Sequence, residues 1–154
     1  MTESPNTYAL ALRLLTGRAR SVADLRRRLQ RKGCETADIE QALSRCLELG
    51  YLNDEQYATD LASGLMRRGT AVGYRLRQEL KKQGIDASLA AKVIEHCSRE
   101  FDENEILAAV MQRRYADIDL TNLDKKQKQR IINYLQRHGF DLAMILQYLH
   151  RIKD

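Results

Sequence analysis

One pattern occurs three times in this chain, and it constrains the fold more than the length of 154 residues does. Each copy has an aliphatic residue eight positions before a glycine, a leucine four before it and a cation two before it. The copies are LRRRLQRKGC (25–34), LRQELKKQGI (76–85) and IINYLQRHGF (131–140). Their glycines are 51 and 55 residues apart. A period of about 50 residues predicts a row of similar small modules rather than one ordinary domain.

The residues around each glycine predict a helix, a tight turn and a second helix. Apolar residues recur six, nine, ten and thirteen positions after every glycine, which is helical spacing. Glycine adopts the left-handed conformation that ends a helix. Thr36, Asp86 and Asp141 follow the three turns as candidate N-caps of the next helix.

A further helix precedes each pair. Asn53 with Gln56, and Asp102 with Glu105, have the spacing of capping boxes, and Pro5 suits the first turn of the first helix. The predicted helices are 5–17, 21–32, 37–49, 54–68, 73–83, 87–97, 103–115, 124–138 and 142–152.

The predicted fold class is therefore all-α, with three tandem three-helix modules. The module boundaries are expected at 1–52, 53–99 and 100–154. Because about 50 residues bury little apolar surface alone, neighbouring modules should pack into an elongated body that can curve. The longer connector at 116–123 is expected to set the third module slightly apart.

The positive charge is concentrated in the second helix of each module. The net charge is only +5, but 13–32 holds eight cations against one anion and 67–82 holds six against one. The stretch 125–137 holds five cations and no anion. Cations in a last helical turn also complement the helix dipole, so any single one is ordinary. Their repetition at equivalent places instead favours a basic stripe that faces a polyanion or an acidic protein groove.

Helical geometry indicates which cations of the first module are accessible. Leu25 and Leu29 mark a buried side, and at about 100° per residue Arg27 and Arg31 lie opposite to it. The candidate partner-binding residues on the second helices are Arg27, Arg28, Arg31, Lys32, Arg75, Arg77, Lys81, Lys82 and Arg137.

No catalytic, cofactor or metal motif is evident. The three histidines are dispersed, and no serine or cysteine lies in a nucleophile turn. Cys97 occupies the repeat position of Cys46 and Ile152, so it is predicted to be a core residue. Three cysteines without a CxxC pair suit a reducing compartment, and the apolar stretch 8–15 is too short for a membrane span. We therefore expect a cytoplasmic protein with no cofactor, metal or membrane partner.

The stretch LGYLNDEQYA (49–58), joined to LMRRG (65–69) and LRQELKKQGI, resembles the RecX family of regulators of the RecA recombinase, and the resemblance covers almost the whole chain. It implies tandem three-helix modules and no enzymatic activity. It also implies binding along the RecA filament on DNA, restraint of strand exchange, ATP hydrolysis and coprotease activity, and hence roles in DNA repair, recombination and the SOS response.

The middle module carries the resemblance most clearly, so it implies further partner-facing residues there. These are Arg67, Arg68, Arg75, Arg77, Lys81 and Lys82. The family commonly opens the second helix of this module with Gly-Pro, where this chain reads AVGY (71–74). This departure leaves the start of that helix, and the direction of Arg75, open.

Two other functions are consistent with the same residues. A helix, a turn and a second helix can present a recognition helix to duplex DNA, so a direct DNA-binding protein is the first alternative. Aromatic residues make up only 6% of the chain, which gives little support to a base-stacking platform. The second alternative is a structural adaptor whose cations serve solubility. In addition to binding to RecA, we expect weak direct binding to single- or double-stranded DNA. We also expect a monomer.

Overall fold

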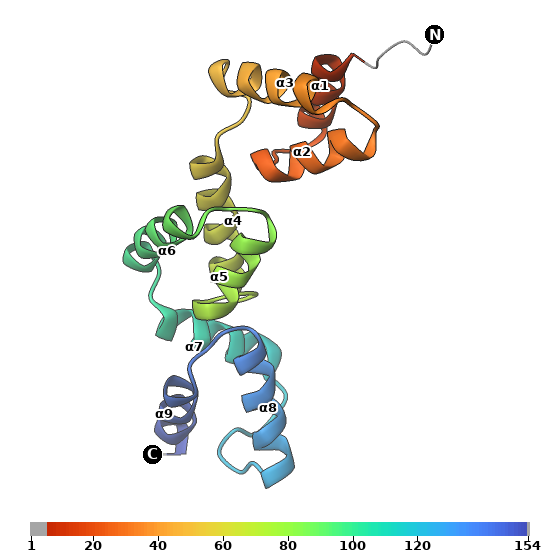
Figure 1. Ribbon diagram of the computed structural model, residues 1–154. Helices are drawn as coiled ribbons and strands as arrows, with labels where there is room; N and C mark the ends of the chain where they lie inside the picture. The colour runs from red at the N-terminus through yellow and green to blue at the C-terminus, as the bar shows by residue number, and fades with distance from the viewer. Residues whose placement is uncertain (1–5, 154) are drawn as a thin grey trace.

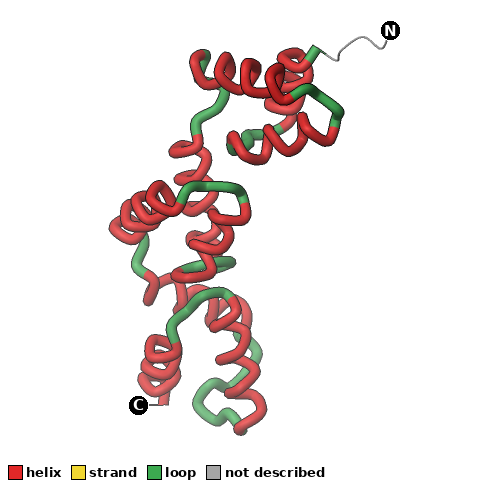
Figure 2. Tube along the Cα trace, in the orientation of Figure 1, coloured by secondary structure: helices red, strands yellow, loops and turns green. Residues whose placement is uncertain are grey.

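The computed structural model describes residues 6–153, and within that range it contains nine α-helices and no strand (Figures 1 and 2). The helices are α1 (Thr7–Gly17), α2 (Val22–Arg31), α3 (Thr36–Glu48), α4 (Asp54–Arg68), α5 (Gly73–Lys82), α6 (Ala87–Glu100), α7 (Glu103–Arg114), α8 (Lys125–Arg137) and α9 (Leu142–Lys153). Groups of three follow one another down an elongated body, which confirms the all-α repeat fold.

The helix starts differ in part from those predicted. Asn6 caps α1 by accepting the Ala9 N–H, so this helix begins at Thr7, and the predicted role of Pro5 lies outside the described residues. The Asn53 side chain caps α4, but the Gln56 side chain bonds Asp60 instead of completing a capping box.

Two more cap predictions need correction. Asp102 caps α7 through the N–H of Asn104 rather than through a box with Glu105. The helix α3 begins at Thr36 itself, so this threonine is not its N-cap. The complete capping box of the described chain opens α8, between Asp124 and Gln127. Side-chain capping depends on the rotamer as well as the spacing, and spacing alone therefore misassigned it.

The apolar residues form two hydrophobic clusters rather than three. The first lies within α1–α3 and includes Leu25, Leu29 and Leu43. The second runs continuously from Ala58 in α4 to Leu149 in α9. The expectation that the connector 116–123 sets the third module apart is therefore wrong. That connector joins α7 to α8 inside the third module, so its length does not affect how the modules meet.

The modules meet through one repeated contact, in which the start of a second helix packs on the glycine turn of the next module. At the first seam, α2 meets the α5–α6 turn, where the Ser21 hydroxyl donates to the Gln83 carbonyl (2.6 Å). The Val22 N–H donates to the Asp54 side chain at the start of α4 (2.8 Å). A Cβ on Gly84 would overlap the Cβ of Ala23. The turn therefore needs glycine for its φ of +78° and also for close packing.

The second seam joins α5 to the α8–α9 turn in the same way. The Val72 N–H donates to the His138 carbonyl (2.9 Å), and the Tyr74 hydroxyl donates to the Gln136 carbonyl (2.8 Å). A Cβ on Gly139 would overlap the Val72 carbonyl oxygen. At the corresponding turn of the first module, the space beside Gly33 is open.

Candidate polyanion-binding face

The second helices α2, α5 and α8 follow one another end to end along one side of the body (Figure 1). The C-terminal end of α8 meets the start of α5 at the second seam, and the end of α5 meets the start of α2 at the first. The partial negative charge of one helix end therefore faces the partial positive charge of the next helix start. The last turns of α5 and α8, which carry Lys81, Lys82 and Arg137, lie at or beside the seams, whereas the last turn of α2 does not.

Eight of the eleven predicted residues have exposed side chains for which residues 6–153 provide no ion pair or side-chain hydrogen bond, and six of these eight belong to the second helices and their C-terminal caps. We call these six the basic face. They are Arg31, Lys32, Arg77, Lys81, Lys82 and Arg137. Because no carboxylate of the described chain neutralises them, their charges are available to an external anion.

Two predicted arginines of the first module are engaged within α2. Asp24 accepts from Arg27 (3.4 Å) and Arg28 (3.1 Å), and also from Arg20 (3.1 Å). Burial acts to raise the pKa of the Asp24 carboxyl, but the hydrogen bonds and charges of Arg28 and Arg20 outweigh it and hold that pKa below its ordinary value. These arginines consequently carry less free charge than their exposure suggests.

The remaining three predicted residues are not part of the basic face. The helix α5 begins at Gly73. Arg75 forms an ion pair with Glu79 (3.0 Å), so its side chain is directed along its own helix. The Arg67 guanidinium lies 5.8 Å from the ring centroid of Phe101. Arg67 and Arg68 end α4, a first helix, so they are not part of the end-to-end row of second helices.

A pocket of about 590 Å³ opens at the second seam and brings Arg75 and Arg137 together. Its lining also contains Arg114, which the sequence analysis missed because it ends a first helix, α7. The Arg114 guanidinium stacks 3.8 Å from the ring centroid of Tyr134. Glu79 also lines this pocket and pairs with Arg75, so Arg114 and Arg137 are the cations that it offers to a planar or phosphorylated anionic group.

Among residues 6–153 there is no cluster of three His, Cys, Asp or Glu side chains that could hold a metal ion. Cys46 and Cys97 are buried, as their repeat positions predicted, and burial raises the pKa of the Cys46 thiol, so its thiolate form is disfavoured. None of the described helices combines the length and apolar content that crossing a bilayer requires.

The fold defines a helical repeat protein with an extended surface. Comparison with known families gives two matches: residues 8–46 match the model for the first three-helix domain of RecX, and residues 102–149 match that for the third. The chain is 43% identical to the regulatory protein RecX of Syntrophotalea carbinolica over 148 residues, which is 96% of this chain and 97% of that protein. It therefore belongs to the RecX family of regulatory proteins.

A second relative and a solved structure are also similar to this chain. The regulatory protein RecX of Trichlorobacter lovleyi is 38% identical, and the match covers 94% of each chain. The crystal structure of RecX from Lactobacillus salivarius superposes with a TM-score of 0.70 over 95% of this chain and 94% of that one, at 19% identity. At that identity the superposition establishes the shared fold only.

Proposed function

We propose that this protein is a non-catalytic regulator that binds the RecA filament on DNA and restrains strand exchange, ATP hydrolysis and coprotease activity during DNA repair and the SOS response. It acts as a monomer in the cytoplasm, where the basic face lies along the filament. The observation that carries the proposal is the row of six unpaired cations on helices placed end to end. Family membership supports it, because members are named as regulatory proteins.

The geometry suits a long anionic assembly better than a compact ligand. Because α8, α5 and α2 are joined at two seams, their cations are distributed along the body instead of being gathered in one pocket. Each guanidinium or ammonium can contact a separate phosphate or carboxylate. If all six contacted duplex phosphates, the logarithm of the affinity would fall with the logarithm of salt concentration with a slope of about −5.

The direct DNA-binding alternative depends on the helices that follow the turns. In a helix-turn-helix protein, the helix that follows the turn enters the major groove. Here α3 carries Asp38, Glu40 and Glu48 against Arg45, and α6 carries two glutamates against two cations. The helices α3 and α6 offer no excess positive charge to a phosphate-lined groove, whereas α9 carries Arg151 and Lys153 and no acidic residue. The helices before the turns are cationic in all three modules, so they are the better candidates for contact.

The test is the effect of this protein on RecA, using a charge-reversal pair and a matched control. We expect the full chain to slow strand exchange and ATP hydrolysis by RecA on single-stranded DNA. Lys81→Glu with Lys82→Glu should weaken this inhibition at least tenfold, because two contact charges are reversed. Arg13→Glu with Arg151→Glu makes the same change in net charge at exposed positions outside the basic face. That control should inhibit like the original protein.

Three results would contradict the proposal in different ways. Absence of any effect on RecA at stoichiometric ratios would reject the regulatory role. Equal inhibition by the Lys81/Lys82 variant and the control would reject the basic face and favour the structural adaptor. Tight, sequence-selective duplex binding without RecA would favour the direct DNA-binding alternative.

A further inference from the structure

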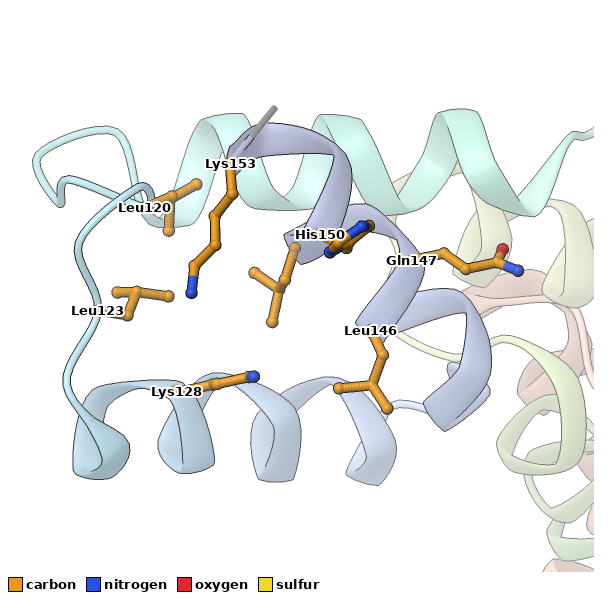
Figure 3. Close-up of a pocket in the computed structure, with 8 residues that line it drawn as sticks. Leu120, Leu123, Lys128, Leu146, Gln147, His150 and Lys153 are labelled. Atoms are coloured by element: carbon orange, nitrogen blue, oxygen red, sulfur yellow. The ribbon is translucent and has the colours of Figure 1, made fainter.

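A second surface, away from the seams, lies between α8 and α9. Two adjoining hollows of about 410 Å³ and 520 Å³ share Lys128 and Leu146 in their linings, so they form one continuous groove. Leu149 and Ile132, both nearly buried, belong to its lining and to the hydrophobic core. Leu120 and Leu123 of the α7–α8 connector line one end (Figure 3). We call this the α8–α9 groove.

The apolar lining of the groove is open to solvent in its middle. Leu146 is 40% exposed although it is a large aliphatic residue on the helix that forms the wall. Figure 3 shows its side chain directed toward α8, across the space from Leu123. Burying such a side chain contributes about 1 kcal/mol or more, so the groove offers binding energy to an apolar partner.

The rim of the groove has one sign of charge. Lys128 from α8 and Lys153 from α9 extend into the space from opposite sides in Figure 3. Lys125 and Lys126 continue the rim along the first turn of α8, where residues 125–130 are all exposed. Neither hollow is lined by an Asp or Glu residue, and the four lysines have no ion pair with any described residue.

We propose that the α8–α9 groove binds an acidic amphipathic segment of a partner protein, with two apolar side chains one helical turn apart on the leucines and carboxylates on the lysine rim. The apolar lining selects the turn-spaced side chains, and the lysines select their acidic flanks. This site is separate from the basic face and does not rest on the proposed function. A nucleic acid fits less well, because phosphates would leave the leucines exposed to water and neither hollow is lined by Phe, Tyr or Trp for base stacking.

The experiment measures binding of a short fluorescent helical peptide, with leucines one turn apart among glutamates, to the full chain by anisotropy. Saturable binding is expected, weakened by salt. Replacing the peptide's leucines by serine should abolish it, and replacing its glutamates by glutamine should weaken it about tenfold. Lys128→Glu with Lys153→Glu should also weaken it about tenfold, which corresponds to 1.4 kcal/mol. Leu146→Glu should have a similar effect.

The matched control is Lys81→Glu with Lys82→Glu, which changes the net charge equally on the basic face and should leave peptide binding unchanged. Circular dichroism verifies folding, and the lysine variant serves as the test even if Leu146→Glu is poorly folded, because both lysines are exposed. Equal binding of the glutamate and glutamine peptides, or no saturable binding, overturns the proposal. Two further results also overturn it if the peptide fails to bind. One is binding of a thymidine oligonucleotide that is lost in the groove variants, and the other is self-association of the chain that is lost in the same variants.

Discussion

The first seam makes a quantitative prediction about Gly84. Alanine at this φ of +78° incurs the left-handed penalty of about 1 kcal/mol, and its Cβ would overlap that of Ala23. Relief of this overlap requires the seam to open, which breaks the bond from Ser21 to Gln83 and the bond from Val22 to Asp54. At about 1 kcal/mol for each hydrogen bond, Gly84→Ala should lower the free energy of unfolding by about 3 kcal/mol in total.

Two further variants separate the backbone effect from the packing effect. Gly33→Ala has nearly the same φ, +83°, but open space around the new Cβ, so it should cost only about 1 kcal/mol. Ala23→Gly makes room for the new methyl group at Gly84. The double variant should therefore recover about 2 kcal/mol relative to the sum of the single ones.

Urea unfolding followed by circular dichroism measures these free energies, and hydrogen exchange of the α2 amides shows whether the seam has opened. Equal stabilities of Gly84→Ala and Gly33→Ala would refute the packing argument. Strict additivity in the double variant would refute it independently, because it would mean that Gly84 and Ala23 do not touch.

Two further stability predictions concern carboxylates at helix starts. Arg28 and Arg20 lower the folded-state pKa of Asp24 against the effect of burial. The ionised carboxylate therefore contributes to the free energy of unfolding above the unfolded-state pKa near 3.8, and this contribution is lost as pH falls through the folded-state pKa. Asp24→Asn should thus be less stable than the original protein at neutral pH, and the difference in urea midpoint should vanish in acid; a constant difference would contradict this. Asp124→Ala removes the capping box of α8 and should cost about 1 kcal/mol, whereas Asp86→Ala, at a cap position without a side-chain capping bond, should cost less.

Much of the fold could be predicted from the sequence because the repeat combines local signals. The helical spacing of apolar residues and the glycines at 33, 84 and 139 placed every helix and turn, and the repeat position of Cys97 identified it as a core residue. The spacing and turn signals depend on residues close in sequence, and the repeat position depends on comparing copies of one pattern. They are therefore readable without knowledge of the tertiary contacts.

The candidate site was only partly predictable. Sequence position identified the second helices as basic, but it could not show that Asp24 engages Arg27 and Arg28, or that Arg75 pairs with Glu79. It also missed Arg114, because this residue reaches the seam pocket from another element. Whether a cation is free depends on which carboxylates approach it in three dimensions.

The sequence by itself determined three copies of a helical module, their turns and the helices that carry the positive charge. Only the tertiary structure decided that the second and third modules share one core while the first keeps its own, and that the basic helices are joined end to end. The physical reason is distance along the chain. Contacts such as that of Ser21 with Gln83, or of Val72 with His138, join residues more than a module apart, and no local pattern encodes their geometry.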